Sequence, residues 1–117
     1  MTNLERAKEM YDQVAQGKIL EAFETYYAEQ VIMEEPNGKR EGKAACRAYE
    51  EQFVSNVKEF HGMHIKAMAE DTEKGKVLIE IEMEVTFTDG NRVIMEQIAA
   101  QQWEKGQIIH ERFYYNA

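Results

Sequence analysis

The sequence contains few residues that interrupt or cross-link a chain. It has one proline and one cysteine in 117 residues. A lone cysteine excludes an internal disulfide and argues against a cysteine metal site. Cys46 lies in an alanine-rich stretch, and we interpret it as a small packed thiol on a helix.

Positive charge is scarce as well. Acidic residues outnumber lysine and arginine by 22 to 14, which gives a net charge of −8, and no basic cluster occurs. Nucleic acids and anionic membrane surfaces both attract basic patches, so neither is a predicted partner.

Long apolar runs are also missing. Residues 1–6 lack the apolar core of a signal peptide, and no segment approaches the length of a membrane span. We therefore expect a cytoplasmic protein. The length and the 44% hydrophobic content favour one globular domain over residues 1–117.

The first part of the chain has helical patterns. Thr2 and Glu5 form a capping-box pattern that predicts a helix start, and Gly17 predicts its end. A second helix is expected over residues 18–27, and a short strand over residues 31–33 stops at Pro36.

A third helix is predicted over residues 43–58. Its apolar positions recur every four residues: Ala45, Tyr49, Phe53 and Val57. Residues 60–69 alternate as a strand whose inward set begins with His61.

Two turn signals, Asp89-Gly90 and Lys105-Gly106, organise the C-terminal part of the chain into three further strands. If both loops have two residues, Phe87 faces Arg92 and Trp103 faces Ile108. The solvent-exposed face of the first of these strands then carries Glu80, Glu82, Glu84 and Thr86. The apolar face collects Val77, Ile79, Ile81, Met83, Val85, Phe87, Ile94, Glu96, Ile98, Ala100, Ile109, Glu111, Phe113 and Tyr115.

Three helices grouped ahead of four consecutive antiparallel strands predict an α+β fold rather than a parallel sheet. One face of such a sheet is apolar and must be covered. We expect a curved antiparallel sheet covered by the three N-terminal helices, around a core or a small pocket.

The element order, the Pro36-Asn37-Gly38 passage and the ending from Trp103 to Asn116 resemble the SnoaL-like branch of the nuclear transport factor 2-like superfamily. The resemblance implies a cone-shaped, cystatin-like α+β barrel with a pocket at its mouth. It also implies frequent dimers through the outer sheet face. Members include ketosteroid isomerases, polyketide cyclases, dehydratases, epoxide hydrolases and binding modules.

SnoaL-like cyclases place an acid–base aspartate near the end of the last strand. The comparable inward positions here hold Glu111 and Phe113, so the resemblance makes Glu111 the nearest replacement.

Glu111 and Glu96 are the only acids predicted on the apolar face, with His61 as the only inward histidine, so these three are the candidate catalytic residues. Apolar surroundings and a neighbouring carboxylate raise a carboxyl pKa, which suits proton abstraction next to a carbonyl. The alternative is structural: the carboxylates pair with a buried arginine or tyrosine, Arg92 being the best placed, and His61 is a hydrogen-bonded core residue. The same three residues are too scattered to predict a metal site, and no cofactor is predicted.

Other inward side chains are candidate substrate-binding residues: Tyr26, Tyr49, Phe53, Met83, Phe113 and Tyr115. Their rings and thioethers suit a small hydrophobic molecule bearing a carbonyl or hydroxyl. We therefore expect a cofactor-free isomerase, cyclase or dehydratase. The alternative is a non-catalytic ligand-binding or carrier protein of the same fold.

The opposite face of the last two strands is less acidic than a solvent face. Its composition is typical of a protein interface and predicts a homodimer. The residues predicted to form it are Met95, Gln97, Gln101, Trp103, His110, Arg112 and Tyr114.

Overall fold

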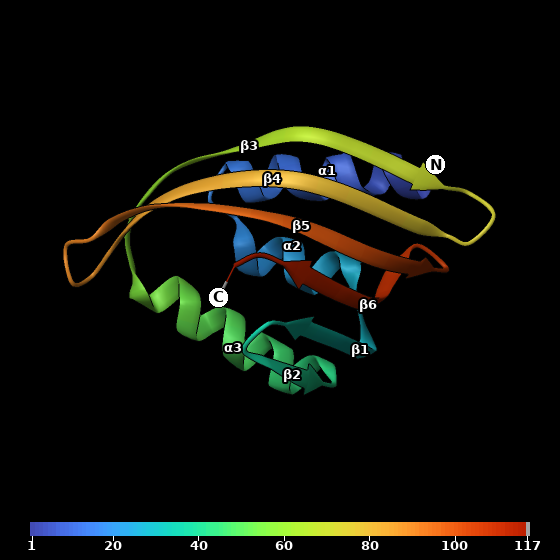
Figure 1. Cartoon of the computed structure of the whole chain (residues 1–117). Helices are drawn as coiled ribbons and strands as arrows, with labels where there is room; N and C mark the ends of the chain where they lie inside the picture. Colours follow the sequence, from blue (N-terminus) through green and yellow to red (C-terminus); the bar gives the residue numbers. More distant parts are fainter. Residues whose placement is uncertain (117) are drawn as a thin grey trace.

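In the computed structural model, which describes residues 1–116, three helices pack on one side of a curved six-stranded sheet (Figure 1). The sheet order is β2-β1-β6-β5-β4-β3. The helices are α1 (Asn3–Ala15), α2 (Ile19–Tyr26) and α3 (Lys43–Asn56). The strands are β1 (Tyr27–Glu35), β2 (Gly38–Glu41), β3 (Val57–Asp71), β4 (Lys76–Phe87), β5 (Arg92–Glu104) and β6 (Gln107–Tyr114). The predicted α+β class is confirmed.

The capping box at the start of α1 is present. The backbone N–H of Glu5 donates to the Thr2 hydroxyl at 3.0 Å, and the Thr2 N–H donates to the Glu5 carboxylate at 2.9 Å. Gly17 ends the helix with a φ of +82°, which costs glycine little. None of the described helices is both long and apolar enough to cross a membrane.

The predicted register between β4 and β5 was wrong by one residue. The Phe87 N–H donates to the Asn91 carbonyl and the Gly90 N–H to the Phe87 carbonyl, each at 2.9 Å, so the loop has three residues, 88–90. Such loops combine a turn with a left-handed residue, here Gly90 at φ +91°. One additional residue turns every β5 side chain to the other face of the sheet. Met83 therefore lies opposite Met95, and Glu82 lies opposite Glu96.

The second hairpin has the predicted two-residue loop, with positive φ at Lys105 and Gly106, and Trp103 does pair with Ile108. A β-bulge follows: Gln102 pairs with His110, so Ile109 has no partner residue in β5. The additional residue in β6 reverses the facing of the side chains a second time, which cancels the effect of the one-residue register error between β4 and β5 on β6. Glu111 consequently points inward as predicted, but it does so opposite Gln101.

Strand β3 also departs from simple alternation. Its register shifts between Phe60 and Gly62 and again between Ile65 and Ala67. Met63, Ile65 and Met68 pack against the core, whereas His61 is exposed and its Nε2 lies 2.7 Å from the Thr86 hydroxyl. The prediction of an inward His61 was therefore wrong.

The sequence prediction also missed the pairing at the other side of the sheet. Strand β1 is far longer than the predicted 31–33, and it pairs antiparallel with β2 and parallel with β6. The parallel pair places Met33 beside Glu111, so the sheet is mixed rather than purely antiparallel.

The register reversal predicts a difference between two isoleucines. Ile108 has no exposure, whereas Ile94, predicted to point inward, is 56% exposed. We expect Ile108→Ala to lower the free energy of unfolding by about 2–5 kcal/mol and Ile94→Ala by about 1 kcal/mol or less. Urea denaturation of both variants measures this, and the reverse order would contradict the β5 orientation.

A cavity with buried carboxylates

A cavity of about 400 Å³ lies between the inner face of the sheet and the three helices. Its wall is mostly apolar, with aromatic rings and methionines from α1, α2, α3, β4, β5 and β6. Phe23 stacks on Tyr27 with ring centres 4.8 Å apart, and Phe53 meets Phe87 edge-on. This size and lining are typical of small-molecule sites.

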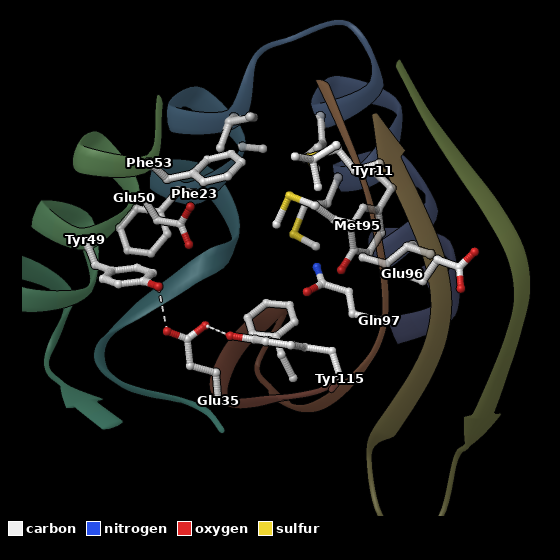
Figure 2. Close-up of a pocket in the computed structure, with 18 of the residues that line it drawn as sticks. Tyr11, Phe23, Glu35, Tyr49, Glu50, Phe53, Met95, Glu96, Gln97 and Tyr115 are labelled. Atoms are coloured by element: carbon white, nitrogen blue, oxygen red, sulfur yellow. Dashed lines mark hydrogen bonds between the residues drawn. The ribbon is translucent and has the colours of Figure 1, made fainter. Parts of the chain in front are cut away.

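Glu50 of α3 directs its carboxylate into the cavity (Figure 2). Among residues 1–116, no side chain donates a hydrogen bond to it. Burial and, to a lesser extent, the charge of Glu111 raise the pKa of Glu50 to about 7, against the opposing effect of the Arg40 guanidinium. A carboxyl group that titrates near neutral pH can both take and return a proton.

Glu111 of β6 lies behind the cavity wall with no exposure to solvent. One carboxylate oxygen accepts the Tyr27 hydroxyl, and the other accepts the Gln101 amide N–H at 2.7 Å. Burial raises the pKa of Glu111 to about 7, while these two hydrogen bonds act in the opposite direction. Both oxygens of Glu111 therefore already have donors, whereas the carboxylate of Glu50 has none among the described residues.

Trp103 fixes the direction of this network. Its indole N–H donates to the Gln101 amide oxygen at 2.9 Å, so the amide nitrogen must face Glu111. The same nitrogen lies 3.2 Å from the Tyr11 hydroxyl, which therefore accepts. The Tyr11 hydroxyl proton has no acceptor among the described residues, and Tyr11 lines the cavity.

The carboxylate of Glu35, at the rim of the cavity, is bound by other side chains of the protein. Figure 2 shows its carboxylate between two tyrosines, with Tyr49 donating at 2.6 Å and Tyr115 at 2.8 Å. Arg40 lies 3.3 Å from Glu35 and stacks over the Tyr49 ring at 3.5 Å. The hydrogen-bonding capacity of Glu35 and the charge of Arg40 are therefore used within the protein.

The structure brings most of the predicted binding residues together. Tyr49, Phe53, Met83, Phe113 and Tyr115 line the cavity. Tyr26 does not: it is buried, its hydroxyl donates to Glu9 at 2.6 Å, and its ring meets Trp103 edge-on.

None of the three predicted catalytic residues is directed into the cavity: Glu111 lies behind its wall, and the other two face outward. Glu96 borders it, but its carboxylate points outward in Figure 2 and lies 3.8 Å from Lys66. His61 is exposed on β3, and Arg92 binds the outer-face Glu84 at 2.6 Å. Glu96, Glu111 and His61 are thus not brought together, and residues 1–116 contain no cluster of three metal-ligating side chains.

The predicted dimer face was also wrong in its composition. Met95, Gln97, Gln101 and Trp103 lie on the inner side of the sheet, because β5 is reversed, and Gln101 and Trp103 are buried. His110, Arg112 and Tyr114 remain on the outer side, with His110 bonded to Glu34 at 2.5 Å.

Glu50 is a candidate residue that was not predicted from the sequence, although a signal for it was present. A spacing of four residues advances about 40° around a helix at each step, so the stripe from Ala45 to Val57 drifts off one face. The alternative stripe at positions 46, 50, 53 and 57 follows the helical period more closely. In the structure Cys46 is fully buried and Ala45 is exposed, so Glu50 belongs to the inward face.

A family model of the SnoaL-like domain matches residues 1–115, and the chain belongs to that family. The resemblance drawn from the sequence is confirmed. A search of curated proteins gave no match.

Solved structures share the fold over nearly the whole chain. A candidate SnoaL-like polyketide cyclase, also described as a carbohydrate phosphatase, from Mesorhizobium loti is 28% identical with a TM-score of 0.82, covering 98% of this chain and 100% of that one. A candidate isomerase from Bacillus subtilis is 16% identical with a TM-score of 0.84, covering 99% and 90%. A protein from Catenulispora acidiphila with a ketosteroid isomerase-like fold, crystallised with trimethylamine, is 12% identical with a TM-score of 0.80, covering 99% and 88%.

The raised pKa of Glu50 predicts how stability varies with pH. The folded-state pKa of about 7 exceeds the ordinary 4.5, so the folded chain binds the extra proton between these pH values. The free energy of unfolding then falls as the pH rises from about 4.5 to 7, and Glu50 adds no further change above that. We expect Glu50→Gln to be more stable than wild type at pH 8 by roughly 1–3 kcal/mol, with little difference at pH 5.

Urea denaturation at both pH values checks this prediction. Glu111, Glu35 and Arg40 also act on Glu50, and they are unchanged in the variant. Glu96→Gln, which removes an outward carboxylate, is the matched control and should leave the pH dependence as in wild type. An equal effect of the two variants would contradict the assignment to Glu50.

Proposed function

We propose that this chain binds a small, mostly apolar carbonyl or hydroxyl compound in the cavity and transfers a proton on it without a cofactor, with Glu50 as the acid–base group. The observation that carries the proposal is the Glu50 carboxylate, which faces an apolar cavity without a protein partner. Relatives of the same fold named as candidate cyclases and isomerases support this class of reaction.

The proposed step begins with a ligand whose carbonyl oxygen accepts the free Tyr11 hydroxyl proton in a hydrogen bond. The Glu50 carboxylate takes a proton from the carbon next to that carbonyl. The C–H bond breaks, an O–H bond forms on Glu50, and the electron pair moves onto the carbonyl oxygen, where Tyr11 stabilises the charge. Glu50 then returns the proton to the same or another atom of the ligand.

Glu50 suits this role better than Glu111, the base expected from the sequence. Glu111 does not line the cavity, and both of its oxygens are occupied by Tyr27 and Gln101. Glu111 has an indirect role in the proposed reaction. Its charge raises the pKa of Glu50, and its hydrogen-bond network, through Gln101, positions Tyr11.

The test uses 1-tetralone, a neutral ketone whose proton next to the carbonyl exchanges slowly with solvent. NMR in D₂O should show the protein accelerating deuterium uptake at that carbon. Glu50→Gln keeps the shape of the side chain and removes the proton acceptor, so exchange should fall by ~10² or more while ketone binding persists.

Glu96→Gln is the control and should exchange at the wild-type rate. If 1-tetralone binds but wild-type protein does not accelerate exchange, proton transfer is ruled out for this probe and the carrier alternative becomes the better reading. Exchange that survives in Glu50→Gln removes Glu50 as the base.

We further propose that the chain forms a homodimer through the outer sheet face, with a corrected set of residues. Leu78, Ile98 and Tyr114 are 47%, 44% and 49% exposed there, and we call them the outer apolar patch. Ile98 pairs directly with Tyr114, and Leu78 pairs with Ala100, two residues further along the same face of β5. Arg112 and Glu80 flank it with opposite charges, which allows two copies to meet around a two-fold axis.

Ile98→Glu should place a charge inside this interface and yield monomers by light scattering at micromolar concentration. Ala44→Glu adds the same charge at an exposed position of α3 and should leave the dimer intact. A wild-type protein that is already monomeric would rule the interface out.

A further inference from the structure

We propose that the ligand carries a positively charged amine, which pairs with Glu50 and lies against the aromatic wall of the cavity. The inference rests on the proposed function in that it uses the same cavity and the same carboxylate: one Glu50 oxygen pairs with the amine, and the other is left to take the proton. It adds the chemical class of compound that the site selects.

The charged side chains that line the cavity are all acidic. Glu35 and Glu50 line it, and Glu111 lies directly behind. None of the lining residues, all of which belong to the described part of the chain, is a lysine, arginine or histidine. An anionic ligand would therefore meet carboxylates without a compensating cation, which is strongly unfavourable in a site of low polarity.

Arg40 does not change this balance. It is the cation whose charge reaches Glu50, but it pairs with Glu35 and stacks on the outer rim residue Tyr49. It is not among the lining residues. The carboxylate left for a ligand cation is therefore Glu50.

Part of the desolvation of Glu50 is already incurred in the folded protein, because its side chain is half-buried in the cavity wall. Forming a buried ion pair is normally offset by removing both charges from water. Here one partner is already half-buried in an apolar wall before the ligand arrives, so less desolvation remains to be incurred on its side when the ligand binds. A charge-assisted hydrogen bond to an ammonium would also give Glu50 the donor that it lacks.

The aromatic wall favours the same ligand. Phe23, Tyr27, Phe53, Phe113 and Tyr115 all line the cavity. The faces of such rings attract cations, and their apolar surface holds the rest of the molecule. Neutral ligands gain only the second of these contributions.

Four compounds with the same ring system separate charge from shape: 1-aminotetralin, 1-tetralol, 1-tetralone and tetralin-1-carboxylate. Calorimetry at pH 8, where Glu50 is ionised, should give an affinity for the amine about tenfold or more above that for the alcohol. The carboxylate should bind about tenfold or more below the alcohol.

Glu50→Gln should bring the amine to within about threefold of the alcohol and leave the alcohol affinity unchanged. Glu96→Gln, which changes a carboxylate directed away from the cavity, should keep the wild-type order. Equal binding of amine and alcohol in wild type, or an amine preference that survives in Glu50→Gln, overturns the inference.

The failure of proton transfer is distinguishable from these results. If the alcohol and ketone bind and the ketone does not exchange deuterium, the proposed catalysis fails while the order of affinities still decides the amine inference. If none of the four compounds binds, both the ligand class and the use of this cavity are wrong.

Discussion

The buried carboxylate of Glu111 constrains the rest of the molecule. With no exposure to solvent, it needs hydrogen-bond donors from the protein, and these come from Tyr27 of β1 and Gln101 of β5. Gln101 in turn is held by Trp103 and donates to Tyr11 of α1. One side chain thereby ties the first helix, the parallel β1–β6 pair and the reversed face of β5 into a single arrangement.

The cavity lies on the side of this network that faces the helices. Glu111 is satisfied and Glu50 is not, although burial raises the pKa of both. An unpartnered carboxylate in an apolar cavity lowers stability at neutral pH, and a well-packed core would not retain it. This expense in folding free energy supports the proposed action of Glu50 on a ligand.

The assignment of roles follows from access rather than from residue type. Glu96, Glu111 and Glu50 are the same amino acid, yet one faces outward, one is enclosed by hydrogen bonds and one faces the cavity. The SnoaL-like family membership fixes the fold around them and leaves the chemistry to these local differences. The proposed acid–base chemistry and the proposed recognition of a cation both depend on the accessible carboxylate.

The sequence by itself determined the three helices, the strands β3 to β6, the helix cap, the inward face of β4 and the family, because these follow from local periodicity and turn chemistry; it missed β2 and most of β1. It also placed Glu111 inward, although only because a three-residue loop and a bulge at Ile109 cancelled in their effect on facing. Tertiary structure alone decided that Glu96 and His61 lie outside, that Gln101 and Trp103 lie inside, and that Glu50 lacks a partner. Side chains alternate along a strand, so one additional loop residue reverses a whole face, and hydrogen bonding across strands settles which loop forms.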